Sequence, residues 1–337
     1  MELKYRPDVR IVANNSDITA LIRQRLIRLS LTDEAGLQSD TLELVLADHD
    51  PLQPIFLPAS GAELEVWLGY TGSMSRMGLF VVDEMELSGP PGCLLIRAKA
   101  AIQTATPTGK HSLYSQKTRS WPLDTGLSSL VEKIAGEHGL RAAIAADIDE
   151  IPIPHIDQVN ESDINLLTRL GRDTGLVIKP ADGALVVCRR GRGISVTGQP
   201  LPILEVQQQD VKSWRVSLSQ REQVGSVVAL YRDVEAADDC EVVVGEGEPV
   251  RRLRYHYPDR CSAEQAARAE HEKSSFLKGT LSLVLAGNGA LVAEGRLKVR
   301  GFCDRLDGEW LITRVTHALD GNGYVSCVEA SRSVAES

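Results

Sequence analysis

The chain has 337 residues with 43% hydrophobic composition, which is typical of a globular protein but too long for one ordinary core, so two or three domains are expected. Its formal net charge of −9 argues against a protein that grips nucleic acid by neutralising phosphates, although DNA could slide past such a surface without being held. An aromatic content of 4% disfavours a stacking platform for single-stranded nucleic acid or for sugars.

Three further features bear on where the protein works. The sequence has no apolar run of about 18 residues, so no transmembrane helix is expected. The first residues, MELKYRPDVRIV, lack an apolar core of signal-peptide length, and export through the general secretory pathway is therefore not expected. The six cysteines are scattered without a CxxC pair, which disfavours a disulfide framework or a zinc site and fits a reducing cytoplasm.

Residues 9–101 have the pattern of a β domain. Glu63–Tyr70 alternates cleanly, with Leu64, Val66 and Leu68 expected to face inward. Short strands separated by polar turns, such as the Ser-Gly-Pro-Pro-Gly cluster at 88–92, are typical of a barrel or sandwich. The other strand-like runs are 25–32, Thr41–Ala47, 79–82 and 93–99.

The pattern changes at residues 106–109, after which two amphipathic helices are expected. The first carries Leu127, Leu130, Val131 and Ile134 at helical spacing and ends at Gly139; the second opens at 160–163 and ends at Gly175. Each terminal glycine is followed by leucine, which predicts a Schellman stop. The cap candidates of the first helix are Asp124 and Thr125.

The last part of the chain returns to β structure. A capping box at 262–265 predicts an alanine-rich helix that runs to about Lys278. Two strands at 309–319 and 324–330 are joined by the turn Asp-Gly-Asn-Gly, which predicts a closing hairpin. In this hairpin Trp310 and Ile312 make a second face partly apolar. Further strands are expected at 211–219, 225–232, 241–244, 280–286 and 296–301.

These patterns predict a mainly β protein with an α+β insert, in which two β-barrel domains bracket a small α/β domain. We place the N-terminal β-barrel domain at residues 1–105 and the middle α/β domain at 106–205. The C-terminal β-barrel domain, with one helix, takes residues 206–337.

The residue identities in three segments are more specific than the spacing of their apolar positions. They are SQKTRSW at 115–121 with the later EHGL ending, IPHIDQVNESD at 153–163 followed by INLLTRLGRDTGLVI, and DGEWLITRVTHALDGNGY at 307–324. In this order they resemble the late control gene D family, the hub proteins of contractile phage tails, which are related to the VgrG spike of type VI secretion. The resemblance covers most of the chain, but residues 1–101 match only in the succession of short strands and turns.

The resemblance implies a structural role in the virion. It implies a homotrimeric ring, with two barrels per chain giving pseudo-sixfold symmetry, that joins the hexameric tail tube to the trimeric spike. The partners implied are the tail tube protein, a separate spike protein, and also the tape measure protein and other baseplate components. The chain would be made in the bacterial host cytoplasm, with neither specific nucleic acid binding nor membrane insertion.

The titratable groups of the middle region have structural explanations that compete with chemical ones. His155 and Asp157 could form an acid/base pair, but an extended approach to a helix explains them better, since a third orienting group is not evident. Asn160, Ser162 and Asp163 could be cation ligands, but oxygen side chains at a helix start are usually caps. His317 is expected in a barrel wall rather than at a metal.

Two arginine-rich runs, at 189–192 and 251–254, could meet the acidic rim of a partner or simply face water. The glycines at 245–247 and 287–289 are expected to form turns, because neither pair stands between a strand and a helix as in a nucleotide cradle. No Gly-x-Ser-x-Gly elbow, HExxH or Walker pattern occurs. We therefore expect no enzyme and no catalytic, cofactor or metal residues; the alternative is a tail-associated peptidoglycan-binding module or cell-wall hydrolase.

Overall fold

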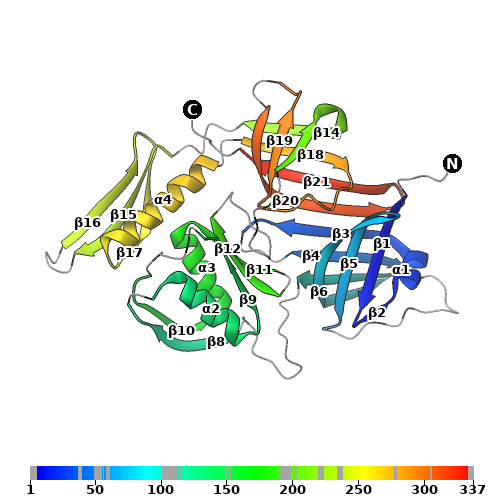
Figure 1. The fold of residues 1–337 in the computed structure, drawn as a ribbon, viewed down its shortest axis with the longest axis horizontal. Coiled ribbons are helices and arrows are strands. Elements are labelled where there is room, and N and C mark those ends of the chain that lie inside the picture. Colours follow the sequence, from blue (N-terminus) through cyan, green and yellow to red (C-terminus); the bar gives the residue numbers. More distant parts are fainter. Residues whose placement is uncertain are drawn as a thin grey trace.

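The computed structural model shows an elongated, mainly β protein (Figure 1). It describes residues 6–332 apart from 37–39, 49–54, 56, 58–60, 101–112, 114, 124, 147, 149–150, 152, 182, 190–198, 200, 202, 219–223, 234–237, 277–278 and 304–305. Among the described helices, none has the length and apolar character needed to traverse a bilayer.

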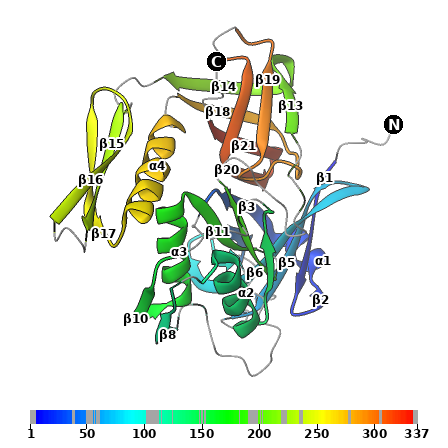
Figure 2. The same cartoon turned by 60° about the vertical axis from the view of Figure 1, so that its left-hand side comes forward.

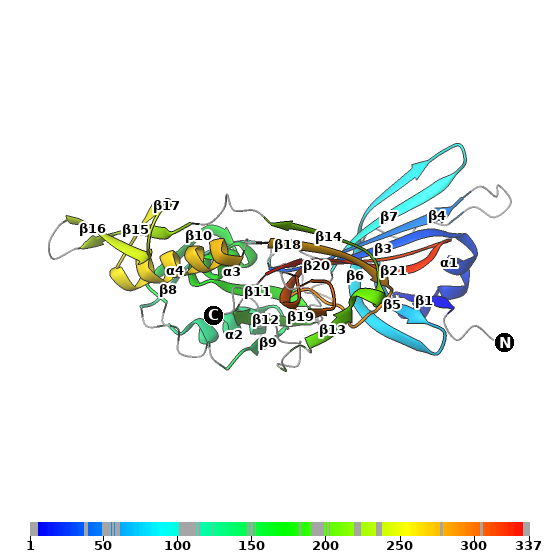
Figure 3. The same ribbon diagram turned by 90° about the horizontal axis from the view of Figure 1, so that it is seen from above.

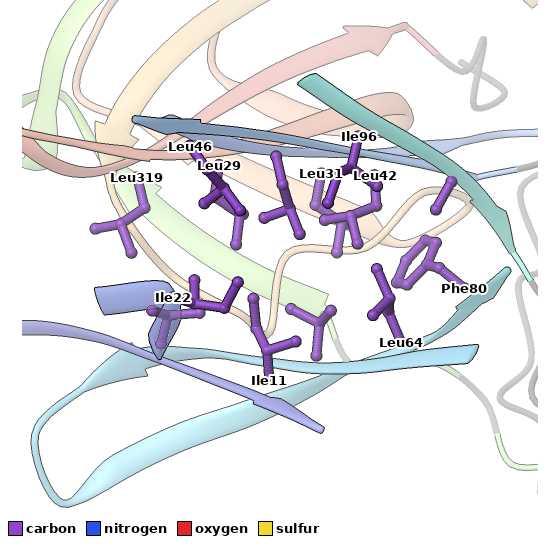
Figure 4. Packing of buried hydrophobic residues seen from close by; sticks show 14 of the residues in the cluster. Ile11, Ile22, Leu29, Leu31, Leu42, Leu46, Leu64, Phe80, Ile96 and Leu319 are labelled. Carbon is purple, nitrogen blue, oxygen red and sulfur yellow. The ribbon is translucent and has the colours of Figure 1, made fainter. Parts of the chain in front are cut away.

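The N-terminal half packs two layers of strands around an aliphatic core (Figure 4). Alternate residues of each strand are buried, as in β4, where Leu42, Leu44 and Leu46 point inward. The long strand β6 pairs with both β5 and β7 and so turns the corner between the layers. The elements are β1 (Pro7–Ala13), β2 (Ser16–Asp17), α1 (Thr19–Arg25), β3 (Leu26–Glu34), β4 (Thr41–Ala47), β5 (Glu63–Tyr70), β6 (Ser73–Ser88) and β7 (Cys93–Ala100).

The C-terminal half is built around Trp310, which is 1% exposed and whose indole N–H donates to the carbonyl of Leu306. The predicted closing hairpin is present, with β20 and β21 paired as far as Asp320 and Gly323. The turn predicted at 287–289 is found at 288–291, where the carbonyl of Asn288 accepts from the backbone of Leu291 at 3.2 Å. A Cβ on Gly287 would meet the ring of Tyr324 at 2.0 Å. The elements are β13 (Ile203–Gln207), a 3-10 turn (Gln208–Asp210), β14 (Val211–Leu218), β18 (Gly279–Ala286), β19 (Arg296–Arg300), β20 (Gly308–Asp320) and β21 (Gly323–Ser331).

The two halves share one sheet. Strand β20 pairs antiparallel with β3, so that thirteen strands join in the order β14-β18-β21-β20-β3-β4-β7-β6-β5-β1-β2, with β19 and β13 branching from β20. Leu319 and Tyr324 of the closing hairpin belong to the N-terminal core. The mainly β class with an α+β insert is thus confirmed, whereas barrel closure and the domain boundaries stay predictions.

The middle module carries two helices between two small sheets. Both predicted helix stops are confirmed, because Gly139 and Gly175 have φ of 67° and 70°. The predicted cap at Thr125 is wrong: its hydroxyl donates to the carbonyl of Pro122, and Gly126 precedes the helix; Asp124 lies outside the described residues. The elements are β8 (Gln116–Trp121), α2 (Leu127–Glu137), β9 (Arg141–Ile144), β10 (Ile156–Ser162), α3 (Asp163–Thr174), β11 (Leu176–Ala181) and β12 (Ala184–Arg189).

A lateral module interrupts the C-terminal half. Its three strands form a separate sheet covered by α4, and α4 packs on α3 of the middle module (Figure 2). The predicted capping box at 262–265 is wrong, since the helix begins two residues earlier and Asp259 accepts hydrogen bonds from the backbone and hydroxyl of Ser262. The elements are β15 (Ser226–Asp233), β16 (Asp238–Gly245), β17 (Val250–Tyr257) and α4 (Arg260–Phe276).

Candidate functional site

The shared sheet has a second face, opposite the cores, that runs across β18, β21, β20, β3, β4, β7 and β6. Residues directly opposite in an antiparallel pair lie on the same face, so the register defines continuous rows across these strands. One row runs Val325, Ala318, Ser30, Glu43, Arg97 and Glu84. The next runs Cys327, Thr316, Thr32, Thr41 and Lys99. We call this surface the ladder face.

The charges of the ladder face are paired across the strands. Arg97 lies 2.9 Å from Glu84 and 3.4 Å from Glu43. Arg314 lies 2.6 Å from Glu34. Between these pairs the face carries small side chains, and the hydroxyls of two threonines from β3 and β20 lie 3.3 Å apart. The charged side chains named here therefore neutralise one another across the strands.

A buried ion cluster, which we call the lysine node, fixes the middle module to the shared sheet. The ammonium of Lys179, on β11, lies 2.9 Å from Asp33 and 2.8 Å from Asp40, and it also donates to the carbonyl of Glu34. The other oxygen of Asp33 accepts from the backbone of Ala293, between β18 and β19. One ammonium thus ties the middle module to the N-terminal half, and Asp33 carries the link on to the C-terminal half.

Burial and charge act on the node in opposite directions. Burial raises the pKa of Asp40 to about 7, and the neighbouring charge of Asp33 adds to this effect. Burial also opposes ionisation of Asp33, but Lys179 outweighs it and holds the pKa of Asp33 below its usual value. The node is therefore a lysine shared unequally by two carboxylates.

Asp163 is the centre of a second ion cluster, in the middle module. It is 0% exposed and lies 2.7 Å from each of Lys117, Arg119 and His138, while Gln158 donates to it at 2.8 Å. Burial alone would raise its pKa, but these partners lower it to about 2. The prediction that Asp163 is a helix cap is wrong, because its partners come from β8, from β10 and from His138, which directly follows α2.

The predicted cap at Ser162 is confirmed: its hydroxyl accepts from the backbone of Asn165 at 3.4 Å. Asn160 instead has φ of 48°, which places it in the irregular part of β10.

Glu137, His138 and Asp163 have ligand atoms close enough together to bind one cation. Two protein cations, Lys117 and Arg119, already neutralise both carboxylates, so the arrangement fits a structural ion cluster better than a metal centre.

His155 and Asp157 line a cleft of about 890 Å³ between the middle and lateral modules. His155 Nε2 lies 3.3 Å from Asp157 Oδ1, and the hydroxyl of Ser120 donates to the same oxygen. Hydrogen bonding to Ser120 lowers the pKa of Asp157. Here the carboxylate stands between hydroxyl and imidazole, whereas activation of a serine requires the imidazole in the middle. The trio therefore does not generate a nucleophile.

The arginine run at 251–254 forms part of strand β17 and lines the same cleft. Sequence reasoning treated it as a charge run and missed the strand, although Val250, Leu253 and Tyr257 supply apolar positions. For the run at 189–192, Arg189 ends β12 and the other three residues lie outside the described part of the chain. We call the opening lined by His155, Arg172, Arg254 and Tyr255 the cationic cleft.

His317 lies in the core of the sheet, as predicted for a wall histidine. It is 0% exposed, its Nδ1 lies 3.0 Å from the hydroxyls of Ser326 and Tyr324, and its Nε2 lies 3.2 Å from the carbonyl of Leu291. Burial lowers its pKa, which favours a neutral ring.

The predicted turn at 245–247 connects β16 with β17, and both glycines have positive φ.

Comparison with known proteins identifies the family. The profile of the family described as phage tail baseplate hub matches residues 41–323. The chain belongs to the phage tail baseplate hub family. It is 30% identical to a probable baseplate hub protein of Escherichia phage 186, over 96% of this chain and 92% of that protein. It is also 30% identical to the probable baseplate hub protein of Escherichia phage P2, with the same coverage.

Solved structures share the fold of this hub at low sequence identity. A 43 kDa tail protein of prophage MuSo2 from Shewanella oneidensis has a TM-score of 0.71 at 16% identity, over 97% of this chain and 98% of its own. A tail protein from Neisseria meningitidis has a TM-score of 0.71 at 12% identity, over 97% of each chain. As a member of the phage tail baseplate hub family, the hub is a structural protein of a phage tail, located in the virion.

Proposed function

We propose that three copies of this hub form a ring in the baseplate that joins a hexameric tail tube to a trimeric spike. The ring surrounds a channel, and the ladder face forms its wall. The observation that carries this proposal is the joining of two β halves into one sheet through β3 and β20.

The joined sheet suits a symmetry adaptor. Each chain offers two β halves, so three chains in a closed ring offer six, which matches a sixfold partner on one side and a threefold partner on the other. Figure 3 shows the ladder-face strands β18, β21, β20, β3 and β4 from the side, with β1, β5, β13 and β19 on one side of them. The ladder face on the other side is left to form a continuous wall.

The charge pattern of the ladder face suits passage rather than binding. Arg28, Arg97 and Arg314 each have a carboxylate partner on the neighbouring strand. A phosphate backbone binds by replacing its counterions with free cations, and paired arginines offer it little. DNA would therefore move through the ring without being held.

The hub acts mechanically and performs no chemistry in this proposal. The trio of Ser120, Asp157 and His155 has the wrong order for nucleophile activation, and both Asp157 and His155 have side chains that are 55% exposed. A cell-wall hydrolase would need two carboxylates with separated pKa values in a cleft. The pKa of Asp157 is lowered and that of Asp173 is raised in the cationic cleft, so a hydrolase is kept as the alternative candidate. The partners proposed are the tail tube protein, the spike protein and other baseplate components such as the tape measure protein.

Native mass spectrometry of the hub mixed with its spike protein tests the ring. The expected complex has three hub chains for each spike trimer, even if the isolated hub is monomeric, because a ring can depend on its partners for stability. A different ratio refutes the ring. A cryo-EM map of the complex tests the wall: Arg97 and Arg314 should face the channel axis, and a map with the ladder face outside refutes this assignment.

A further inference from the structure

The cationic cleft lies between two modules that are far apart in the sequence. One wall comes from the start of β10 and the end of α3; the other comes from β17 and α4. At about 890 Å³ the cleft falls within the range of roughly 300–1,000 Å³ that is usual for ligand sites. A concave site of this size can hold several residues of an extended chain.

The charged side chains of the cleft are unevenly paired. Five arginines and three carboxylates line it. Three of the arginines are neutralised by salt bridges to glutamates, at 2.6–2.7 Å: Arg169 with Glu161, Arg251 with Glu270 and Arg252 with Glu241. Among the described residues, Arg172 and Arg254 have no carboxylate at ion-pair distance. Neither guanidinium group is held in a salt bridge, although Arg172 also attracts the neighbouring Asp173; one group stands on each wall.

Apolar surface accompanies the two arginines. Tyr255 is 74% exposed, and it stands next to Arg254 on β17. Ile153, Pro154 and Leu170 line the opposite wall. Arginine and tyrosine are the residues that contribute most often to binding energy at protein interfaces, and a partner would bury both the ring and the guanidinium groups.

We propose that the cationic cleft binds an acidic, extended segment of a partner protein, whose carboxylates pair with Arg172 and Arg254 and whose apolar side chains pack on Tyr255. Nucleic acid is a poorer ligand, because Asp157 and Asp173 also line the cleft and repel a backbone that carries a charge at every residue. A peptide can place its carboxylates at the arginines and its apolar groups at the acidic positions. The cleft would thus hold a second baseplate component on the side of the hub, away from the ladder face.

The test is fluorescence anisotropy with the full chain and a labelled octapeptide that alternates glutamate with leucine or phenylalanine. Binding is expected at micromolar concentration and should weaken as salt is added. The double variant Arg172→Glu with Arg254→Glu should weaken binding at least about tenfold, because it puts like charges where the pairs would form. The matched control is Arg300→Glu on β19, an exposed arginine outside the cleft that should leave binding unchanged.

A second probe separates the classes of ligand. The same peptide with glutamine in place of glutamate, and a short DNA duplex, are titrated under identical conditions, and circular dichroism checks that each variant is folded. The proposal is overturned if the acidic peptide does not bind, if the glutamine peptide binds equally well, or if the duplex binds more tightly. It is also overturned if the double variant and Arg300→Glu bind the acidic peptide alike.

Discussion

Replacing Lys179 with methionine should loosen the middle module from the shared sheet. Methionine keeps most of the side-chain volume but removes the ammonium that contacts Asp33, Asp40 and the carbonyl of Glu34. The side chains of the three charged residues are only 15–20% exposed, so water replaces little of the lost contact. The variant isolates the electrostatic contribution of the lysine node from its packing.

The expected loss of stability in Lys179→Met follows from the carboxylates that stay buried after the ammonium is removed. Removing one partner of a buried pair costs about 3–5 kcal/mol, because an uncompensated charge stays behind. Partial exposure and proton uptake by Asp40, whose pKa is already raised to about 7, reduce the cost to about 2–4 kcal/mol. The matched control is Lys99→Met, which breaks the exposed pair with Asp83 and should cost less than about 1 kcal/mol.

Hydrogen exchange followed by mass spectrometry is the suitable assay, since a protein with several cores need not unfold in one step. Peptides that cover β3 and β11 should exchange faster in Lys179→Met, while the core peptides of β20 and β21 change less. Adding Asp40→Asn should recover part of the loss, because it removes one of the two facing carboxylates. Equal protection of β3 and β11 in the Lys179 and Lys99 variants would refute the reasoning.

Three more predictions use the same structure. Raising the pH from about 4 to 8 should lower the melting temperature through Asp40. A carboxyl whose pKa is raised on folding binds more protons in the folded than in the unfolded state, so stability falls as pH rises through that interval. The same dependence of melting temperature on pH in Asp40→Asn would contradict this. Trp310→Ala should cost about 3–5 kcal/mol of unfolding free energy in a denaturant titration, and a loss below about 1 kcal/mol would show that Trp310 does not anchor the closing hairpin. His155→Ala should leave particle assembly and infectivity intact, and normal particles that fail to infect would reveal chemistry at this site.

Sequence reasoning succeeded where structure is determined by neighbouring residues. Gly139 and Gly175 end their helices because only a residue without a Cβ takes the left-handed backbone cheaply. It failed at Ser262, where a capping box pattern occurs one turn inside a helix that Asp259 already caps. Helix α1 was missed because it is seven residues long and its N-terminus has no side-chain cap.

The pairing of β3 with β20 could not be predicted in the same way. Its register joins Thr32 to Thr316, and no local pattern states which distant strand a given edge will accept. The same limit applies to the lysine node and to the two sides of the cationic cleft. In each case the residue types can be read from the sequence, but which side chains lie close together depends on contacts between modules.

The position of Leu319 and Tyr324 in the N-terminal core also constrains the order of folding during synthesis. The first seven strands leave the ribosome early, yet two residues of their core lie about 220 residues beyond the last of these strands. Domains usually fold in the order in which they emerge, and pairing between distant segments is slow because a long loop must close first. The edge of β3 that accepts β20 therefore stays unpaired until residues 308–320 have been made. A chain truncated before residue 308 would lack Leu319 and Tyr324 in its first core and would expose the edge of β3, and such chains are candidates for aggregation rather than assembly into tails.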